Sequence, residues 1–265
     1  MDIILYYIYR ADEKTKVIDA LNSVNIDESR SIMQYRDSNG NTLLHDACKH
    51  RAIRCVSFFA EQGMSLNDPN REFCSPLHLA VLSRSAPIVE LLITRGAITN
   101  SLNNQSKTAF DLAQEKGFVD IVRVIERLVS FFAGYVEKKT SNGLLGMSDH
   151  YSSKWISVMN KINGDSFPEG GRLIYYESNQ HALPEKIFPL YGAKLFFEDS
   201  PDSLSLKLTT RFSDGELKLR ALEELKLRAP DRNTFKHLVA ALTGQHHTIS
   251  SSTSSAPSLT SPHLV

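Results

Sequence analysis

Apolar and polar positions recur at a fixed spacing through the first half of the chain. The recurring phrase begins at positions 42, 75 and 108, which are 33 residues apart, and reads Thr-Leu-Leu-His-Asp-Ala, Ser-Pro-Leu-His-Leu-Ala and Thr-Ala-Phe-Asp-Leu-Ala. An apolar pair follows each phrase in register, at 55–56, 88–89 and 121–122. The pattern predicts a short helix at each phrase and a second helix after it, with the units stacked on one another.

Residues 1–36 lack this phrase and are predicted to be helical. Val17, Ile18 and Leu21 are spaced as one buried helical face. Because a stack of repeats exposes apolar surface at its ends, this segment is expected to cap the first unit. A degenerate repeat is the alternative, but little matches when the period is shifted back to Tyr9. The apolar run 3–9 is far shorter than the roughly 20 residues that span a membrane.

The third unit departs from the other two at its end. Val129 stands where Gly63 and Gly96 close the earlier units. Its second helix is therefore expected to continue from Phe118 to about Lys139. The next residues, 140–149, have the composition of a loop and are predicted to link the stack to a second domain.

Residues 150–243 follow a different pattern and are predicted to form a smaller α+β domain. Trp155, Val158, Met159 and Ile162 share one face of a predicted helix. Strands are predicted at 172–176, at 194–197 and, from a strict alternation of apolar and polar residues, at 203–212.

Two helices are predicted to end this domain. Residues 213–216 resemble a capping box that opens a near-duplicated run of Glu, Leu, Lys, Arg and Ala, which Pro230 ends. The last helix is amphipathic, with Phe235, Leu238, Val239 and Leu242 on one face. Residues 244–265 contain ten Ser or Thr and no Asp, Glu, Lys or Arg, so this tail is expected to be disordered.

The repeated phrase resembles the ankyrin signature T-P-L-H-x-A, whose period is about 33 residues. The resemblance implies an α-helical ankyrin-repeat solenoid of about three repeats, at 37–69, 70–102 and 103–139, with a helical N-terminal cap. It implies that Thr42 caps a helix and that His45 and His78 make structural hydrogen bonds. The departures from the family pattern are Arg51 and Arg84 at a glycine position that Gly117 retains, Phe73 at a second glycine position, and Asp111 in place of the histidine.

Ankyrin repeats in general bind proteins through their hairpin tips and the concave face of their first helices. The resemblance therefore predicts a protein partner. Its predicted contacts are Asn39, Asn41, Arg71, Phe73 and Asn104 on the tips, and Asp46, Lys49, His50, Leu82 and Glu115 on the concave face. An aromatic residue on an exposed hairpin is a candidate hot spot, and packing of Phe73 on the neighbouring repeat is the alternative.

Charge and composition do not favour nucleic acid or membranes. Thirty basic and thirty acidic residues cancel, so the chain has no general attraction to polyanions. The predicted order over residues 155–229 is a helix, three strands and a helix. Double-stranded RNA-binding domains have the same order. Asp214 and Glu216 at the start of the second of these helices would repel phosphate, so no nucleic-acid or membrane partner is predicted.

The residues also give no sign of catalysis. Cys48, Cys55 and Cys74 lack metal-binding spacing and are predicted to be reduced packing residues of an intracellular protein. No motif for catalysis, phosphate binding or metal binding is present, so no catalytic residue, cofactor or metal is predicted.

These features predict a cytoplasmic protein–protein interaction adaptor that is not an enzyme. The arrangement also resembles ankyrin-repeat effectors that intracellular bacteria deliver into the host cytoplasm by type IV secretion, because residues 248–261 are rich in small polar side chains. The alternative is an enzyme whose repeats recruit a protein substrate to a catalytic second domain, with a site built from Tyr175, Tyr176, Glu177 and His181.

Overall fold

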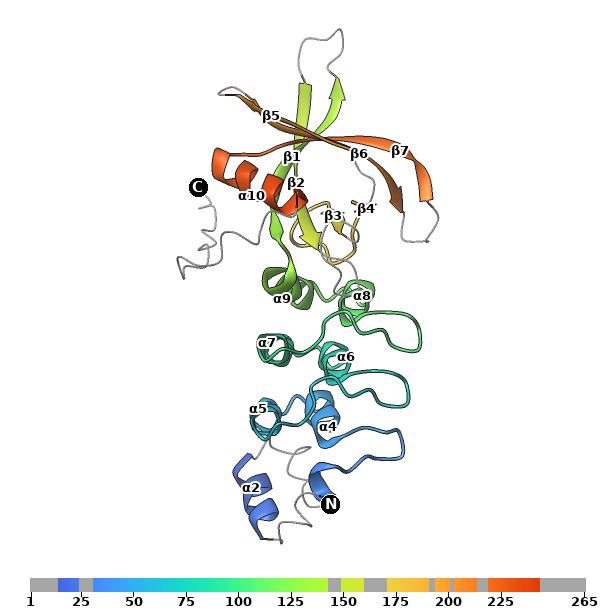
Figure 1. Cartoon of the computed structure of the whole chain (residues 1–265), viewed down its shortest axis with the longest axis vertical. Coiled ribbons are helices and arrows are strands. Elements are labelled where there is room, and N and C mark those ends of the chain that lie inside the picture. Colours follow the sequence, from blue (N-terminus) through green and yellow to red (C-terminus); the bar gives the residue numbers. More distant parts are fainter. Residues whose placement is uncertain are drawn as a thin grey trace.

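The computed structural model describes residues 14–23, 31–142, 149–159, 171–190, 194–200, 203–213 and 219–243. A stack of helices forms one end of the molecule and a curled antiparallel sheet forms the other (Figure 1). The predicted tail at 244–265 and the apolar run at 3–9 lie outside the described residues.

The helices stand in two columns (Figure 1). The inner helices are α4 (Leu43–Lys49), α6 (Pro76–Leu82) and α8 (Ala109–Glu115), and the outer helices are α5 (Ile53–Glu61), α7 (Ala86–Thr94) and α9 (Val119–Val129). Helix α2 (Lys14–Asn22) packs on α5. Val17 and Leu21 of α2 are buried, which confirms the predicted face.

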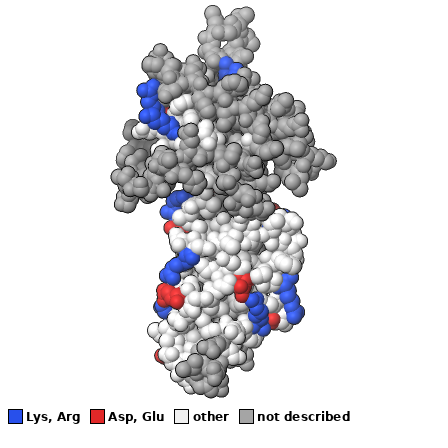
Figure 2. Space-filling view, in the orientation of Figure 1, with Lys and Arg blue, Asp and Glu red and all other residues white. Residues whose placement is uncertain are grey.

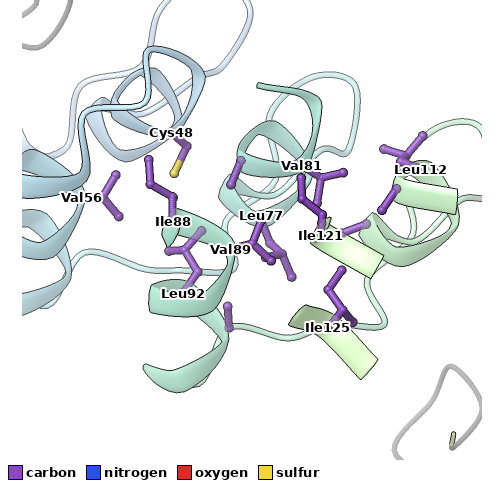
Figure 3. Packing of buried hydrophobic residues seen from close by; sticks show 14 of the residues in the cluster. Cys48, Val56, Leu77, Val81, Ile88, Val89, Leu92, Leu112, Ile121 and Ile125 are labelled. Atoms are coloured by element: carbon purple, nitrogen blue, oxygen red, sulfur yellow. The ribbon is translucent and has the colours of Figure 1, made fainter. Parts of the chain in front are cut away.

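The repeats share one core. Side chains from helices of successive repeats point toward one another, among them Cys48, Leu77, Ile88 and Ile121 (Figure 3). Ala47, Ala80 and Ala113 of the inner helices are fully buried, and their small size lets the paired helices approach closely. All three cysteines lie in this part of the molecule and are buried, as predicted.

Each inner helix begins with a reciprocal cap that reaches into the next layer. The backbone N–H of Thr42 donates to His45 Nδ1 at 3.2 Å, and His45 Nε2 donates to the carbonyl of Cys74, in the following hairpin, at 3.0 Å. Burial lowers the pKa of His45 and so favours the neutral ring that these bonds require. His78 repeats the arrangement with the carbonyl of Lys107 at 3.2 Å.

Asp111 changes this cap in the third repeat. Its Oδ2 accepts from the backbone N–H of Thr108 at 3.0 Å, as the histidine ring nitrogen does in the other repeats. Its Oδ1 lies 3.6 Å from Arg172 Nη1 in the sheet. The carboxylate therefore joins the stack to the sheet where no fourth repeat follows.

The sheet has seven antiparallel strands in the order β4-β3-β2-β1-β7-β6-β5, and a pairing of β4 with β6 curls it. The strands are β1 (Phe132–Asn142), β2 (Asp149–Met159), β3 (Arg172–Tyr176), β4 (Lys186–Pro189), β5 (Lys194–Ser200), β6 (Ser203–Ser213) and β7 (Leu219–Arg228). Helix α10 (Arg232–Thr243) follows β7 and packs against β1 and β6. The predicted strands at 172–176, 194–197 and 203–212 and the last helix are confirmed.

Three predicted helical segments are wrong. Helix α9 ends at Val129, and Phe132 begins β1 instead of continuing the helix to Lys139. Residues 140–142 and 149 of the predicted linker belong to strands β1 and β2, and residues 143–148 lie outside the described residues. Strand β2 replaces the helix predicted at Trp155, and β7 replaces the near-duplicated helix.

The error at β2 has a clear physical cause. Ile156 and Val158 point into the core between sheet and α10, whereas Trp155 and Met159 join the core of the repeats. A strand buried on both faces reads as a continuous apolar run and imitates a helical face. In β7, Glu, Leu, Lys and Arg are strong helix formers, but pairing with β6 overrides that preference.

A buried polar cluster holds the two parts together. The guanidinium of Arg123 stacks on Tyr176, with its carbon 4.4 Å from the ring centre, and pairs with Glu126. Glu126 Oε2 also accepts from the indole N–H of Trp155 at 3.1 Å. Gln114 Nε2 donates to the hydroxyl of Tyr176 at 2.7 Å. Glu126 Oε1 is buried without a hydrogen-bond partner, but the other contacts of this cluster are made at fixed positions and give the sheet a defined orientation on the last repeat.

We expect Arg123→Met to lower the free energy of unfolding by about 3 kcal/mol, because Glu126 would remain buried without its cation. The double variant Arg123→Met/Glu126→Gln should lose less, since the amide still accepts from Trp155. Urea unfolding followed by the fluorescence of Trp155, the single tryptophan, measures both. As a control, Lys107→Met removes an exposed pair with Glu115 and should cost less than about 1 kcal/mol. Equal losses in the single and double variants would contradict this role of the ion pair.

Candidate protein-binding surface

Three hairpin tips, at 37–41, 70–74 and 103–107, project from the inner-helix side of the stack (Figure 1). Each tip is closed by an Asp or Asn side chain: Asn70 Oδ1 accepts from the backbone N–H groups of Glu72 and Cys74, both at 2.9 Å. Adjacent tips are joined through Arg71 N–H to the carbonyl of Asn39, and through Asn104 N–H to that of Glu72, both at 2.9 Å. The tips therefore form one continuous, hydrogen-bonded surface.

Phe73 is the most unusual residue of this surface. Its φ is 58°, in the left-handed region, where Gly40 and Ser106 stand in the other two tips. Its side chain is 61% exposed, which excludes the alternative that it packs on the neighbouring repeat. A non-glycine residue in this conformation costs about 1 kcal/mol, and an exposed aromatic ring does not recover that cost within the described fold.

The structure exposes eight of the ten predicted contact residues. These are Asn39, Lys49, His50, Arg71, Phe73, Leu82, Asn104 and Glu115. Leu82 is 43% exposed on α6 and adds an apolar group to the inner-helix face. Glu115 pairs with Lys107 at 2.6 Å.

Asn41 and Asp46 are buried and have structural surroundings. The Asn41 side chain donates to Asp37 at 3.0 Å and accepts from Asn70 at 2.8 Å, which ties the first two tips together. Asp46 is only 4% exposed, and its Oδ2 has no hydrogen-bond partner. Burial, followed by the nearby charge of Asp37, raises the pKa of Asp46 to about 6.

Several charges on the repeats stand in pairs of opposite sign. Lys and Arg on the face shown in Figure 2 are scattered, several beside Asp or Glu, and form no continuous basic field. The pairs include Arg36 with Asp68 at 2.5 Å and Arg127 with Glu90 at 2.8 Å. Such a surface favours a partner of mixed polarity.

In the part of the chain that the structure describes, the cysteines form no exposed thiolate and the potential metal ligands form no cluster. Burial raises the pKa of the Cys48 and Cys74 thiols, and Cys55 is also buried, so none of the three is placed as an exposed thiolate. Among the described residues, no group of three or more His, Cys, Asp or Glu could hold a metal ion. No helix in the described ranges is long and apolar enough to cross a membrane.

A comparison with family models identifies the stack. Residues 5–101 match the model described as ankyrin repeats in three copies. The chain contains ankyrin repeats. The matched segment begins before α2, while the third helix pair, α8 and α9, lies beyond it and is identified by the structure and the repeated phrase.

Curated relatives extend the comparison. XBAT35 of Arabidopsis thaliana, named as an E3 ubiquitin-protein ligase, is 29% identical over 170 residues, which cover 62% of this chain and 37% of that protein. XBAT34 of the same plant, with the same designation, is 29% identical over 167 residues, which cover 60% of this chain and 44% of that protein. Mouse ankyrin repeat and SOCS box protein 11 is 38% identical over 78 residues, 29% of this chain and 24% of that protein. The chain spans less than half the length of these relatives.

These relatives correct two predictions. The prediction that the chain is not an enzyme is contradicted by similarity to two proteins that are named E3 ubiquitin-protein ligases. The resemblance to bacterial effectors delivered by type IV secretion is not shown, because the relatives described above are plant and animal proteins. The predicted ankyrin repeats are confirmed.

Asp46 makes stability depend on pH. A carboxyl whose pKa is 3.8 when unfolded and about 6 when folded binds more protons in the folded state between these values, so its contribution to stability falls as pH rises from about 4 to 6. We expect Asp46→Asn to gain stability relative to the wild type by about 2 to 3 kcal/mol between pH 3.5 and pH 7. Urea unfolding at each pH measures the difference.

As a control, the same Asp→Asn substitution is made at an aspartate that is exposed to solvent. Asp19 is exposed on α2, and Asp19→Asn should alter stability at pH 7 by less than about 0.5 kcal/mol. A difference between Asp46→Asn and the wild type that stays constant from pH 3.5 to 7 would show that Asp46 is not an ionised, desolvated carboxylate at neutral pH.

Proposed function

We propose that this chain recruits a protein substrate for a ubiquitin-ligase reaction, with the ankyrin repeats as the substrate-binding surface. The observation that carries the proposal is Phe73, an exposed aromatic ring held in a left-handed backbone conformation at the central hairpin tip. The proposed contacts are the eight exposed residues of the tips and inner helices.

The relatives support the ligase part of the proposal. A match over 62% of the 265 residues spans about 164 positions, more than the 129 residues that precede the end of α9. The similarity to XBAT35 therefore extends beyond the repeats into the sheet region. Similarity confined to the repeats would support protein binding alone.

The energetics at Phe73 support the binding part. The left-handed conformation costs about 1 kcal/mol for a residue with a Cβ. Exposing the ring adds a further cost of hydration that a partner's pocket would remove, and aromatic anchors of this kind contribute about 2 kcal/mol or more to an interface. The free energy of binding a partner can therefore offset the conformational cost at Phe73, which contacts within the described fold do not offset.

The tips and the inner helices together suit an interface of ordinary size. A stable interface buries roughly 800 Å² on each partner and places apolar anchors inside a polar rim. Phe73 and Leu82 supply the apolar groups, and Asn39, Arg71 and Asn104 supply polar groups around the tips.

The sheet gives the recruited protein a defined position. Asp111 and Gln114 of the last repeat contact Arg172 and Tyr176 of β3. A substrate held on the tips would therefore have a fixed orientation relative to the sheet. We propose that this geometry presents the substrate for modification, and delivery by type IV secretion forms no part of the proposal.

We expect Phe73→Gly to separate binding from folding. Glycine adopts the left-handed conformation freely, so the free energy of unfolding should rise by about 1 kcal/mol. The affinity for recruited substrates should fall by about 2 kcal/mol, or roughly 30-fold. Urea unfolding measures the first change, and quantitative proximity labelling in cells, followed by titration of purified candidates, measures the second.

A matched control and a functional readout complete the test. Ser106 has the same backbone conformation in the next tip, and Ser106→Gly should leave substrate capture unchanged. Proteins captured by the wild type but lost with Phe73→Gly should carry less ubiquitin in cells that lack this protein. Unchanged ubiquitin modification of those proteins would refute the proposed function.

A further inference from the structure

The turns between inner and outer helices carry three exposed cations, Arg51, Arg84 and Lys116, which we name the turn strip. No carboxylate of the described residues lies within ion-pair distance of any of the three. This contrasts with Arg36, Arg95, Lys107 and Arg127 elsewhere on the repeats, each of which has an acidic partner. The turn strip is thus a row of uncompensated positive charge.

Arg51 is held along the stack by its own hydrogen bond. Its Nε donates to the carbonyl of Ser83 in the next repeat at 2.5 Å, and Ser83 Oγ donates back to the carbonyl of Cys48 at 2.9 Å. Both terminal nitrogens of the guanidinium make no hydrogen bond within the described chain. Their parallel N–H groups match the two oxygens of a carboxylate.

Arg84 occupies the equivalent position one unit further on, but it contacts the next repeat through a ring instead of a hydrogen bond. Its guanidinium carbon lies 5.3 Å from the centre of the Phe118 ring, in the third repeat. This cation–π contact holds the guanidinium beside the ring and leaves its N–H groups without a hydrogen bond to the described residues, so they are available for an anion. Lys116, two residues before Phe118, continues the strip in the same turn.

The backbone at these turns shows that glycine would be the unstrained choice. The φ angle is 59° at Arg51 and 54° at Arg84, against 71° at Gly117 in the equivalent position of the third repeat. Each arginine therefore carries a conformational cost of about 1 kcal/mol. A single hydrogen bond or cation–π contact offsets that cost in the fold but leaves the exposed N–H groups without a role.

Negative groups near the strip do not neutralise it. Glu115 pairs with Lys107 on the side of the tips, and Asp46 is buried beneath its helix. Asp120 is exposed at the start of α9, so the positive potential is greatest at the first two turns.

We propose that the turn strip binds an extended acidic segment of the recruited protein, through carboxylates paired with Arg51 and Arg84. This inference rests on the proposed function and specifies the class of substrate. Packed helices lie roughly 8 to 10 Å apart. A segment in the extended polyproline II conformation advances about 3.1 Å per residue and presents every third side chain to the same side. Successive turns therefore match acidic residues about three positions apart in an extended segment.

Fluorescence anisotropy with a defined probe tests this inference. The probe is a short labelled peptide with glutamate at every third position, and the control peptide has glutamine at the same positions. The wild-type chain should bind the glutamate peptide about tenfold more tightly than the glutamine peptide, and less tightly as salt is raised. Equal binding of the two peptides would overturn the inference without any variant.

Variants then locate the site. Arg51→Gln/Arg84→Gln should weaken binding of the glutamate peptide about tenfold. Arg95→Gln/Arg127→Gln removes the same charge from two exposed arginines that have acidic partners and should change binding less than about twofold. If Arg95→Gln/Arg127→Gln weakened binding of the glutamate peptide more than Arg51→Gln/Arg84→Gln did, the assignment of the site to the turn strip would be overturned. Thermal unfolding confirms that each variant is folded. If the first pair unfolds, Lys116→Gln is the substitute, because it removes a charge from the strip without breaking an ion pair of the described residues.

Capture of protein substrates distinguishes failure of this inference from failure of the proposed function. If the turn-strip variants capture substrates as the wild type does while Phe73→Gly loses them, the acidic-segment inference is wrong and the proposed function stands. If Phe73→Gly also retains every substrate, the proposed function fails as well. Loss of substrates in both sets of variants supports both.

Discussion

The cap at the start of each inner helix cannot be completed within its own repeat, and the structure depends on this constraint. His45 and His78 each reach a carbonyl in the following hairpin, so every repeat requires a neighbour on one side. At the last repeat there is no further hairpin to accept such a bond. Asp111 replaces the histidine there, and Arg172 of the sheet takes the place of the missing neighbour. The sheet therefore closes the stack chemically as well as sterically.

The same dependence explains why the junction is polar. An apolar stack end would only require cover, whereas Gln114, Arg123 and Glu126 require partners in defined positions. Tyr176, Trp155 and the carbonyls of Asn179 and His181 provide these partners. Such a junction transmits orientation, because rotation of the sheet on the repeats would break several buried bonds together.

Strain in the repeats is concentrated at two kinds of turn. Phe73 at a hairpin tip and Arg51 and Arg84 at the inter-helix turns occupy left-handed conformations that favour glycine. Gly40 and Gly117 show that the same turns also form with glycine in this chain. Residues with a Cβ reduce stability at such positions. The hydrogen bond of Arg51 to Ser83 and the contact of Arg84 with the Phe118 ring offset this cost within the fold, whereas the ring of Phe73 stays exposed.

The sequence by itself determined the repeats, their period, their buried positions and the unusual residues at their turns. It could do so because each ankyrin unit depends on local pattern and nearest neighbours, so that a phrase written three times describes the structure. Tertiary structure decided the rest. Helix formers became β7 through pairing with β6, and an apolar run became β2 because two cores bury its two faces. Asn41 and Asp46, expected on the surface, were placed inside by neighbouring layers. Contacts such as Trp155 with Glu126 join residues far apart along the chain, and no local pattern encodes them.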